Sequence, residues 1–97
     1  MNEVTYTIAE NAPIASGVFR LRLTGDTSAI TAPGQFLELK LPGFFLRRPI
    51  SICDWDEKSV TLLYKVVGGG TDWLSRCTPG QALDALSGLG NGFAASD

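Results

Sequence analysis

Two short segments of the chain carry residues that are suited to binding an anion. In the first, Arg47 and Arg48 directly precede Pro49. An arginine guanidinium binds phosphate through a planar fork of N–H donors, and a following proline holds Arg48 in an extended conformation. In the second, residues 68–71 read Gly-Gly-Gly-Thr before a predicted helix. Glycines let the backbone approach a ligand, and the N–H groups of a first helical turn attract negative charge. Together the segments predict a site for a phosphate or a diphosphate.

Each segment also has a simpler interpretation when it is taken alone. A bare Arg-Arg pair is most often a solvated surface pair, and a glycine run before a helix can be only a loop and a cap. The run is not a Walker loop, because no Gly-Lys-Ser/Thr ends it, and it lacks the βαβ context of a GxGxxG fingerprint. Ser51, between Ile50 and Ile52, can simply bond a neighbouring backbone group. The combination of the two segments is what favours a ligand.

The rest of the composition argues against hydrolytic or metal chemistry. The chain has no histidine, so no Ser/His/Asp arrangement exists, and its carboxylates are not clustered. Its two cysteines, Cys53 and Cys77, form no CxxC pair and cannot supply a four-cysteine site. We expect both to be small buried side chains. No catalytic or metal-ligating residue is predicted, and any chemistry at this domain would come from a cofactor.

Length and charge favour one cytoplasmic domain that spans residues 1–97. The 97 residues are 44% hydrophobic and 19% charged, as in an ordinary globular domain. A net charge of −2 and a pI near 4.9 argue against nucleic acid as a partner. We find no signal peptide at the start and no apolar run of the length that a membrane span needs. These features predict no membrane association.

Alternating apolar and polar residues predict an all-β fold. We expect strands at residues 4–10, 17–24, 37–41, 50–55, 59–67 and 82–86, with a break at 11–13 and a glycine-rich loop at 87–93. The strand at 59–67 is apolar enough to be covered on both faces for part of its length. One helix is predicted, capped by Thr71 and stopped by Pro79-Gly80. Six short strands and one short helix indicate a six-stranded antiparallel Greek-key β-barrel.

Three segments resemble a known family. Arg48-Pro49-Ile50-Ser51 resembles the Arg-x-Tyr-Ser flavin motif of the ferredoxin–NADP reductase superfamily. Residues 65–74 are similar to that family's second flavin segment, in which glycines and a Ser/Thr at a helix start hold the diphosphate. Residues 46–52 and 89–93 are most similar to one branch, the electron-transfer subunit of the NAD-dependent dihydroorotate dehydrogenase of pyrimidine biosynthesis.

This resemblance implies an FAD site and its contacts. Arg48 would hold the FAD diphosphate, Ser51 and the Ile50 backbone would meet the isoalloxazine ring, and Gly70 and Thr71 would take the diphosphate at the helix start. The full set that it implies is Arg48, Pro49, Ile50, Ser51, Lys65, Val66, Val67, Gly69, Gly70 and Thr71. Hydrogen-bond donors at the ring's N5 and O4 atoms would tune a bound flavin. In the family, the partner is an FMN-containing catalytic subunit, and electrons pass through a [2Fe-2S] cluster and FAD to NAD.

The sequence departs from the family pattern in three places. Ile50 replaces the usual aromatic residue, and Ser87-Gly88 stands where the branch has Gly-Pro. The chain stops at Asp97, before the family's nicotinamide domain and cluster cysteines would begin. We therefore expect FAD binding at most from this chain, without NAD turnover or a [2Fe-2S] cluster. An apolar face near Leu89 and Phe93 leaves self-association open.

Two other functions remain as alternatives at this stage. The chain could be a non-catalytic small β-barrel that serves as an interaction module, with the arginines and glycines merely structural. It could also be the flavin domain of a related sulfide dehydrogenase or hydrogenase reductase subunit. Flavin absorbance of the purified protein separates the first of these from an FAD-binding domain.

Overall fold

The computed structural model describes residues 2–31, 35–41 and 48–89. In these residues, six strands and one helix follow one another. Their bounds are β1 Asn2–Ala15, β2 Val18–Thr24, β3 Phe36–Lys40, β4 Arg48–Trp55, β5 Ser59–Lys65, α1 Gly69–Ser75 and β6 Ala82–Leu89.

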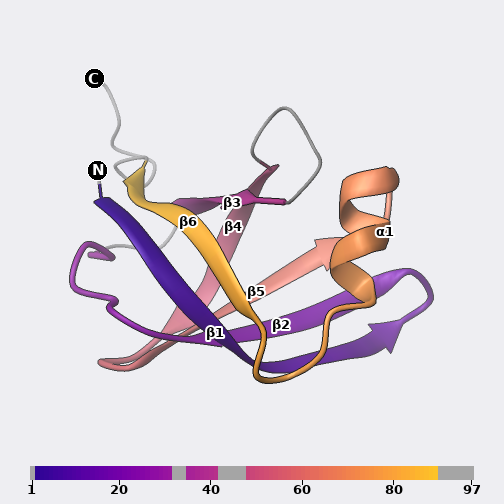
Figure 1. The fold of residues 1–97 in the computed structure, drawn as a ribbon, viewed down its shortest axis with the longest axis horizontal. Helices are drawn as coiled ribbons and strands as arrows, with labels where there is room; N and C mark the ends of the chain where they lie inside the picture. The colour runs from indigo at the N-terminus through magenta and orange to yellow at the C-terminus, as the bar shows by residue number, and fades with distance from the viewer. Residues whose placement is uncertain (1, 32–34, 42–47, 90–97) are drawn as a thin grey trace.

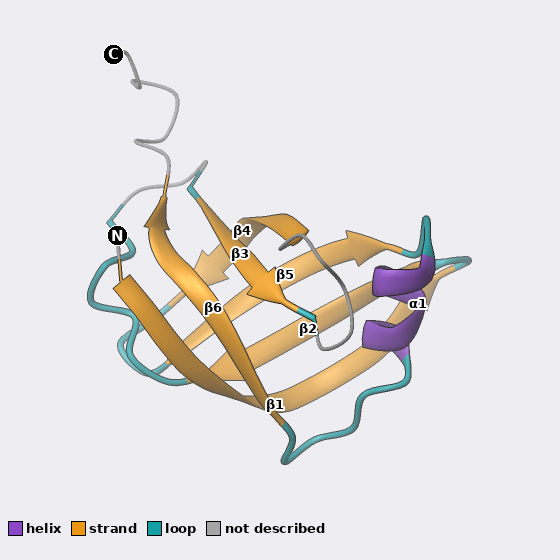
Figure 2. Cartoon of the chain, turned by 45° about the horizontal axis from the view of Figure 1, so that its top comes forward, coloured by secondary structure: helices purple, strands orange, loops and turns teal. Residues whose placement is uncertain are grey.

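The strands close into one antiparallel barrel, as Figure 1 shows. Their order around the barrel is β1-β2-β5-β4-β3-β6, and β1 pairs with both β2 and β6. Because β2 lies beside β5 and β3 beside β6, strands that are distant in sequence become neighbours in a Greek-key arrangement. The helix α1 lies at the end of the barrel where β5 ends (Figure 2). The predicted barrel with one short helix is confirmed.

The barrel interior is filled by the apolar residues that alternate along each strand. In β3, for example, Leu37 and Leu39 are fully buried, and Leu41 just beyond it is nearly so. The other fully buried apolar side chains are Tyr6, Leu21, Leu23, Val60, Leu62, Leu74 and Ala85. Period-two patterning places one set of side chains inside a barrel wall, so this part of the prediction is confirmed.

The predicted break at 11–13 is wrong, because β1 runs through it to Ala15. A β-bulge accounts for the difference: Ile8 pairs with Leu23 but Glu10 with Arg22, so Ala9 is an extra residue. A bulge bends a strand without ending it, and it changes which residues face inward. As a result Asn11 pairs with the inward-facing Leu21, whereas simple alternation would have put it on the outer face.

The helix begins and ends earlier than predicted. Gly68 is the N-cap, and the first helical hydrogen bond runs from the Asp72 N–H to the Gly68 carbonyl at 2.9 Å. Thr71 therefore lies inside the first turn instead of capping it. The helix ends at Ser75 with Arg76 as its C-cap, before Pro79 can act as the stop.

Two strand ends and one cysteine also differ from prediction. The strand β5 ends at Lys65. Ser59 and Val60 at its start are both buried, so it is covered on both faces there, whereas Leu63 nearer its end is 41% exposed. The strand β6 continues to Leu89, through the start of the predicted loop, because it pairs with both β1 and β3. Cys77 is buried as expected, but Cys53 is exposed at a bulge in β4. Arg47, Phe93 and residues 90–92 of the last predicted motif lie outside the described residues.

Adjacent leucines in β5 test this assignment of faces. Leu62 is fully buried and Leu63 is exposed on the outer face. Replacing Leu62 by Ala should lower the free energy of unfolding by about 2–5 kcal/mol, because it leaves a cavity in the barrel core. Leu63→Ala, the matched control, should cost less than about 1 kcal/mol. Urea denaturation of both variants measures the difference, and equal losses would contradict the inward and outward assignment.

Candidate functional site

The strands β4 and β5 separate before either of them ends. Their pairing runs from Trp55–Val60 through Asp54–Thr61 to Ile52–Leu62, past the bulge at Cys53. Among the described residues, no register pair joins 48–51 of β4 with 63–65 of β5. Figure 1 shows the two strands diverging from their hairpin, with β5 running towards α1. The facing edges of β4 and β5 do not pair with each other in this region, so their backbone N–H and C=O groups are available to other partners.

A groove of about 330 Å³ occupies this separation. Its lining comes from the start of β4, the end of β5, and α1 with the turn before it. The lining residues are Arg48, Pro49, Ile50, Ser51, Leu63, Tyr64, Lys65, Val67 and Thr71. Seven of the ten residues predicted to contact the ligand are among them. The two segments singled out from the sequence thus meet at one groove.

Three predicted contact residues do not line the groove. The side chain of Val66 packs against the core, and its N–H donates to the Gly17 carbonyl at 2.8 Å. Gly69 and Gly70 form the first turn of α1 beside the groove. Their first-turn N–H groups precede the first helical hydrogen bond and so lack helical acceptors.

The sequence prediction missed Leu63 and Tyr64, which both line the groove. Strict alternation along β5 contained the signal for Leu63. It puts Val60, Leu62 and Tyr64 inward and leaves Leu63 on the outer face with Lys65. No local signal marks Tyr64 as a groove residue, since it belongs to the buried set.

The groove is positively charged in a protein of net charge −2. Arg48 and Lys65 both line it and both are exposed, and none of its described lining residues is acidic. The nearest acidic side chain of α1, Asp72, is held in an ion pair by Arg76 of the same helix. This charge distribution suits an anionic group that enters from solvent.

Thr71 shapes the turn between β5 and α1. It is 3% exposed. Its Oγ1 accepts hydrogen bonds from the N–H groups of Val67 at 2.8 Å and Gly68 at 3.2 Å, and its hydroxyl donates to the Gly68 carbonyl at 3.2 Å. The hydroxyl is therefore engaged by the protein, and Thr71 acts by fixing the backbone of the turn.

Tyr64 connects the wall of the groove to β1. Its hydroxyl donates to Asn11 Oδ1 at 2.8 Å, and its ring stacks on Phe19 with the ring centres 5.5 Å apart. Asn11 Nδ2 in turn donates to the carbonyls of Leu74 at 2.8 Å and Cys77 at 3.0 Å. The amide orientation follows from these partners, because an oxygen at the Nδ2 position would face two carbonyls. One side chain thus joins β1, β5 and the end of α1.

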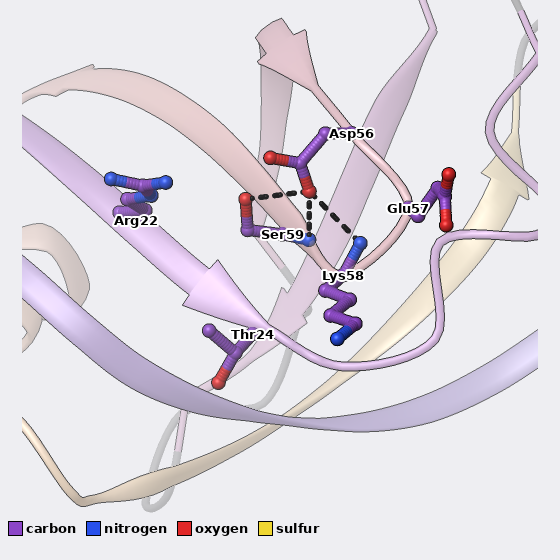
Figure 3. A pocket seen from close by; sticks show the side chains of 6 residues that line it. All are labelled: Arg22, Thr24, Asp56, Glu57, Lys58 and Ser59. Atoms are coloured by element: carbon purple, nitrogen blue, oxygen red, sulfur yellow. Dashed lines mark hydrogen bonds between the residues drawn. The ribbon is translucent and has the colours of Figure 1, made fainter.

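A second hollow, of about 470 Å³, lies beside the β4–β5 hairpin (Figure 3). Two cations and two carboxylates line it together with Thr24 and Ser59; they are Arg22, Lys58, Asp56 and Glu57. Asp56 Oδ1 already accepts bonds from the Lys58 N–H at 2.9 Å and from the N–H and hydroxyl of Ser59 at 2.8 and 3.0 Å. These bonds lower the pKa of Asp56, with the Lys58 N–H as the largest cause. The mixed charges define no ligand class, and the carboxylate stabilises the hairpin turn.

Among the described residues, no helix is both long enough and apolar enough to cross a membrane.

Proteins of similar fold and proteins of similar sequence both match most of this chain. No protein-family model matches the chain. A cytochrome P450 reductase of Amycolatopsis, GcoB, is 28% identical, with a TM-score of 0.78 over 93% of this chain and 29% of that one. A siderophore-interacting protein from Acinetobacter baumannii shares the fold, with a TM-score of 0.75 at 13% identity over 90% of this chain and 40% of that one. The chain shares its fold with these two ferredoxin–NADP reductase-like proteins, which agrees with the superfamily that its motifs predicted.

Within that class, the sequence relatives point to one branch. A protein of Geobacillus is 38% identical over 96% of this chain, and one of Listeria monocytogenes is 41% identical over the same share. Both are named dihydroorotate dehydrogenase B (NAD(+)), electron transfer subunit. The chain is a homologue of these electron transfer subunits, and the predicted branch is confirmed. It spans 38% of the length of the curated relatives that it matches.

The pKa of Tyr64 gives a test of the groove wall. Burial raises this pKa from 10.0 to about 12, although the hydrogen bond with Asn11 partly offsets the effect. The neutral phenol therefore contributes stability that is complete below pH 10.0 and is lost as the pH rises through about 12. In a Tyr6→Phe variant Tyr64 is the only tyrosine. Its tyrosinate absorbance should appear near pH 12 and not near 10.0. A step at the ordinary value would contradict the buried, hydrogen-bonded phenol.

Proposed function

We propose that this barrel binds FAD at the groove between β4 and β5. The observation that carries the proposal is that the two flavin-motif segments, which are separate in the sequence, line one positively charged groove. The homology to electron transfer subunits supports a redox cofactor over a purely structural role. The interaction-module alternative has no such support from the relatives.

In this proposal one part of the groove binds the diphosphate and another part contacts the isoalloxazine ring. Arg48 binds the diphosphate through its guanidinium, with the backbone N–H groups of Gly69, Gly70 and Thr71 as further donors. Ser51, the Ile50 backbone and the facing strand edges meet the isoalloxazine ring, where polar donors tune the flavin. Pro49, Lys65, Val66 and Val67 complete the contacts around the ring. Bound FAD would supply hydride and single-electron chemistry that no side chain here provides.

The size of the groove fits part of such a ligand. Small-molecule sites typically occupy ~300–1,000 Å³, and this groove, at about 330 Å³, lies at the low end of that range. A dinucleotide is longer than a drug-sized ligand, so the groove would hold one portion of FAD while the remainder extends over the surface.

The relatives supply a proposal for the whole protein's activity. We propose that the chain serves in an electron-transfer subunit that passes electrons from dihydroorotate oxidation to NAD in pyrimidine biosynthesis, with an FMN-containing catalytic subunit as partner. The relatives' names support this branch over sulfide dehydrogenase or hydrogenase reductase subunits. We also propose the cytoplasm as its location, which agrees with two cysteines that are both free thiols.

Titration of the purified chain with FAD tests the central proposal. We expect saturable binding with quenched flavin fluorescence and a shifted visible spectrum, because the ring leaves water for a groove wall. FMN, which lacks the adenylate half, serves as a competitor and shows whether the dinucleotide is preferred. If neither flavin binds to folded protein, the flavin proposal is wrong and the interaction-module alternative leads.

Arg48→Ala should weaken FAD binding by about 1.5–3 kcal/mol, because it removes a charged hydrogen bond to the diphosphate. That corresponds to a dissociation constant raised ~10- to ~150-fold. Arg22→Ala removes the same charge from the far end of β2, outside the groove, and is the matched control. Isothermal titration measures both variants. Equal affinity of Arg48→Ala and wild type would place the diphosphate elsewhere.

A further inference from the structure

The Asn11 side chain connects β5 and α1, two elements that contribute residues to the groove. Asn11 receives the Tyr64 hydroxyl on Oδ1 and donates through Nδ2 to the carbonyls of Leu74 and Cys77, with all three distances between 2.8 and 3.0 Å. Tyr64 lines the groove on β5, and Leu74 belongs to α1, whose first turn carries the glycine segment. Asn11 itself does not line the groove.

The helix is too short to fix its own orientation and depends on its contacts with the barrel. It spans only seven residues, from Gly69 to Ser75, and a helix this short is not stable by itself. Leu74 buries its side chain in the core, which sets the depth of α1. Trp73 also packs against the core, and Cys77 just beyond the helix is buried in it. Apolar contacts of this kind are not directional, whereas the two hydrogen bonds from Asn11 to the helix end are, and so they restrict its rotation.

The Asn11 amide also provides hydrogen-bond donors to backbone carbonyls at the end of α1. The last carbonyls of a helix lack partners within the helix. The Leu74 carbonyl already accepts the Cys77 N–H at 3.0 Å, so Asn11 gives it a second donor, and Asn11 also supplies a donor to the Cys77 carbonyl just beyond the helix, in a part-buried position. The β1 bulge at Ala9 is what turns Asn11 inward to reach them.

We infer that Asn11 is a positioning residue of the groove: it acts through Tyr64 and α1 to hold the β5 wall and the glycine turn at a fixed separation. This inference rests on the proposed FAD site for its functional consequence. The ligand class is therefore a flavin nucleotide, and the role of Asn11 is to preorganise the protein groups that meet it.

Three variants separate the parts of this network. Asn11→Ala removes all three bonds. Asn11→Asp keeps the shape and the acceptor for Tyr64 but replaces the donors to α1 by an oxygen, so it releases the helix alone. Tyr64→Phe keeps the helix bonds and releases the wall. Tyr6→Phe is the matched control, since it removes one phenolic hydrogen bond, to the Asp26 carbonyl at 3.0 Å, from a buried tyrosine that does not line the groove.

The first readout needs no flavin. Amide hydrogen exchange should accelerate at least tenfold at Asp72, Arg76 and Cys77 in Asn11→Ala and Asn11→Asp. The Gly25 amide, which bonds the Lys58 carbonyl near the hairpin, should exchange at the wild-type rate. Unchanged exchange in α1 would overturn the inference, whether or not FAD binds.

The second readout is FAD affinity, measured at a temperature where every variant is folded. We expect FAD affinity to fall tenfold or more in Asn11→Ala and Asn11→Asp, and by a smaller factor in Tyr64→Phe. In Tyr6→Phe it should fall less than twofold, even if that variant loses as much stability as the Asn11 variants. Wild-type affinity in Asn11→Ala, or losses that simply follow stability in all four variants, would overturn the positioning role. If wild-type protein does not bind FAD, the proposed function itself fails. The exchange data alone then decide whether Asn11 holds α1 in place.

Discussion

Closure of the barrel by β1 is the constraint on which the rest of the structure depends. This strand is 14 residues long and pairs with β6 through residues 2–7 and with β2 through residues 7–15. The strand passes from one neighbour to the other near residue 7, and the bulge at Ala9, which bends it, lies close to that transition. The bulge at Ala9 bends β1 and also turns Asn11 inward. The closure of the barrel and the hydrogen bonds from Asn11 to the end of α1 therefore depend on the same local feature.

A closed barrel also explains why the groove forms where it does. Every strand has two neighbours, so free backbone edges arise only where a pairing stops early. That happens between β4 and β5 beyond Ile52 and Leu62, on the side of the bulge at Cys53 away from the hairpin. Both strands continue past this point because β3 still pairs with β4 and β2 still pairs with β5. The groove is therefore held open by pairings on its outer sides.

Local patterns were enough to predict the barrel and most of the groove, and the errors share a physical origin. Alternation identified the inward faces, and the chemistry of Arg48 and the glycine run pointed to two segments that meet at one groove. The bulge at Ala9 and the length of β6 were missed, because each depends on which strands pair across the barrel. Asn11 looked like a strand breaker because its partners, Tyr64 and α1, are more than fifty residues away.

The hydrogen bonds of Thr71 indicate which groups of this turn can donate to a ligand. A threonine after a glycine run suggests a hydroxyl that donates directly to a phosphate, yet this hydroxyl is committed to the Gly68 backbone. Breaking that bond to reach a ligand would gain one hydrogen bond and lose another, with little net benefit. The donors of this turn that would cost the fold nothing are the first-turn N–H groups, together with the exposed Arg48 guanidinium across the groove. Preorganisation by Thr71 and Asn11, instead of direct contact by either, is thus the arrangement that the hydrogen-bond network favours.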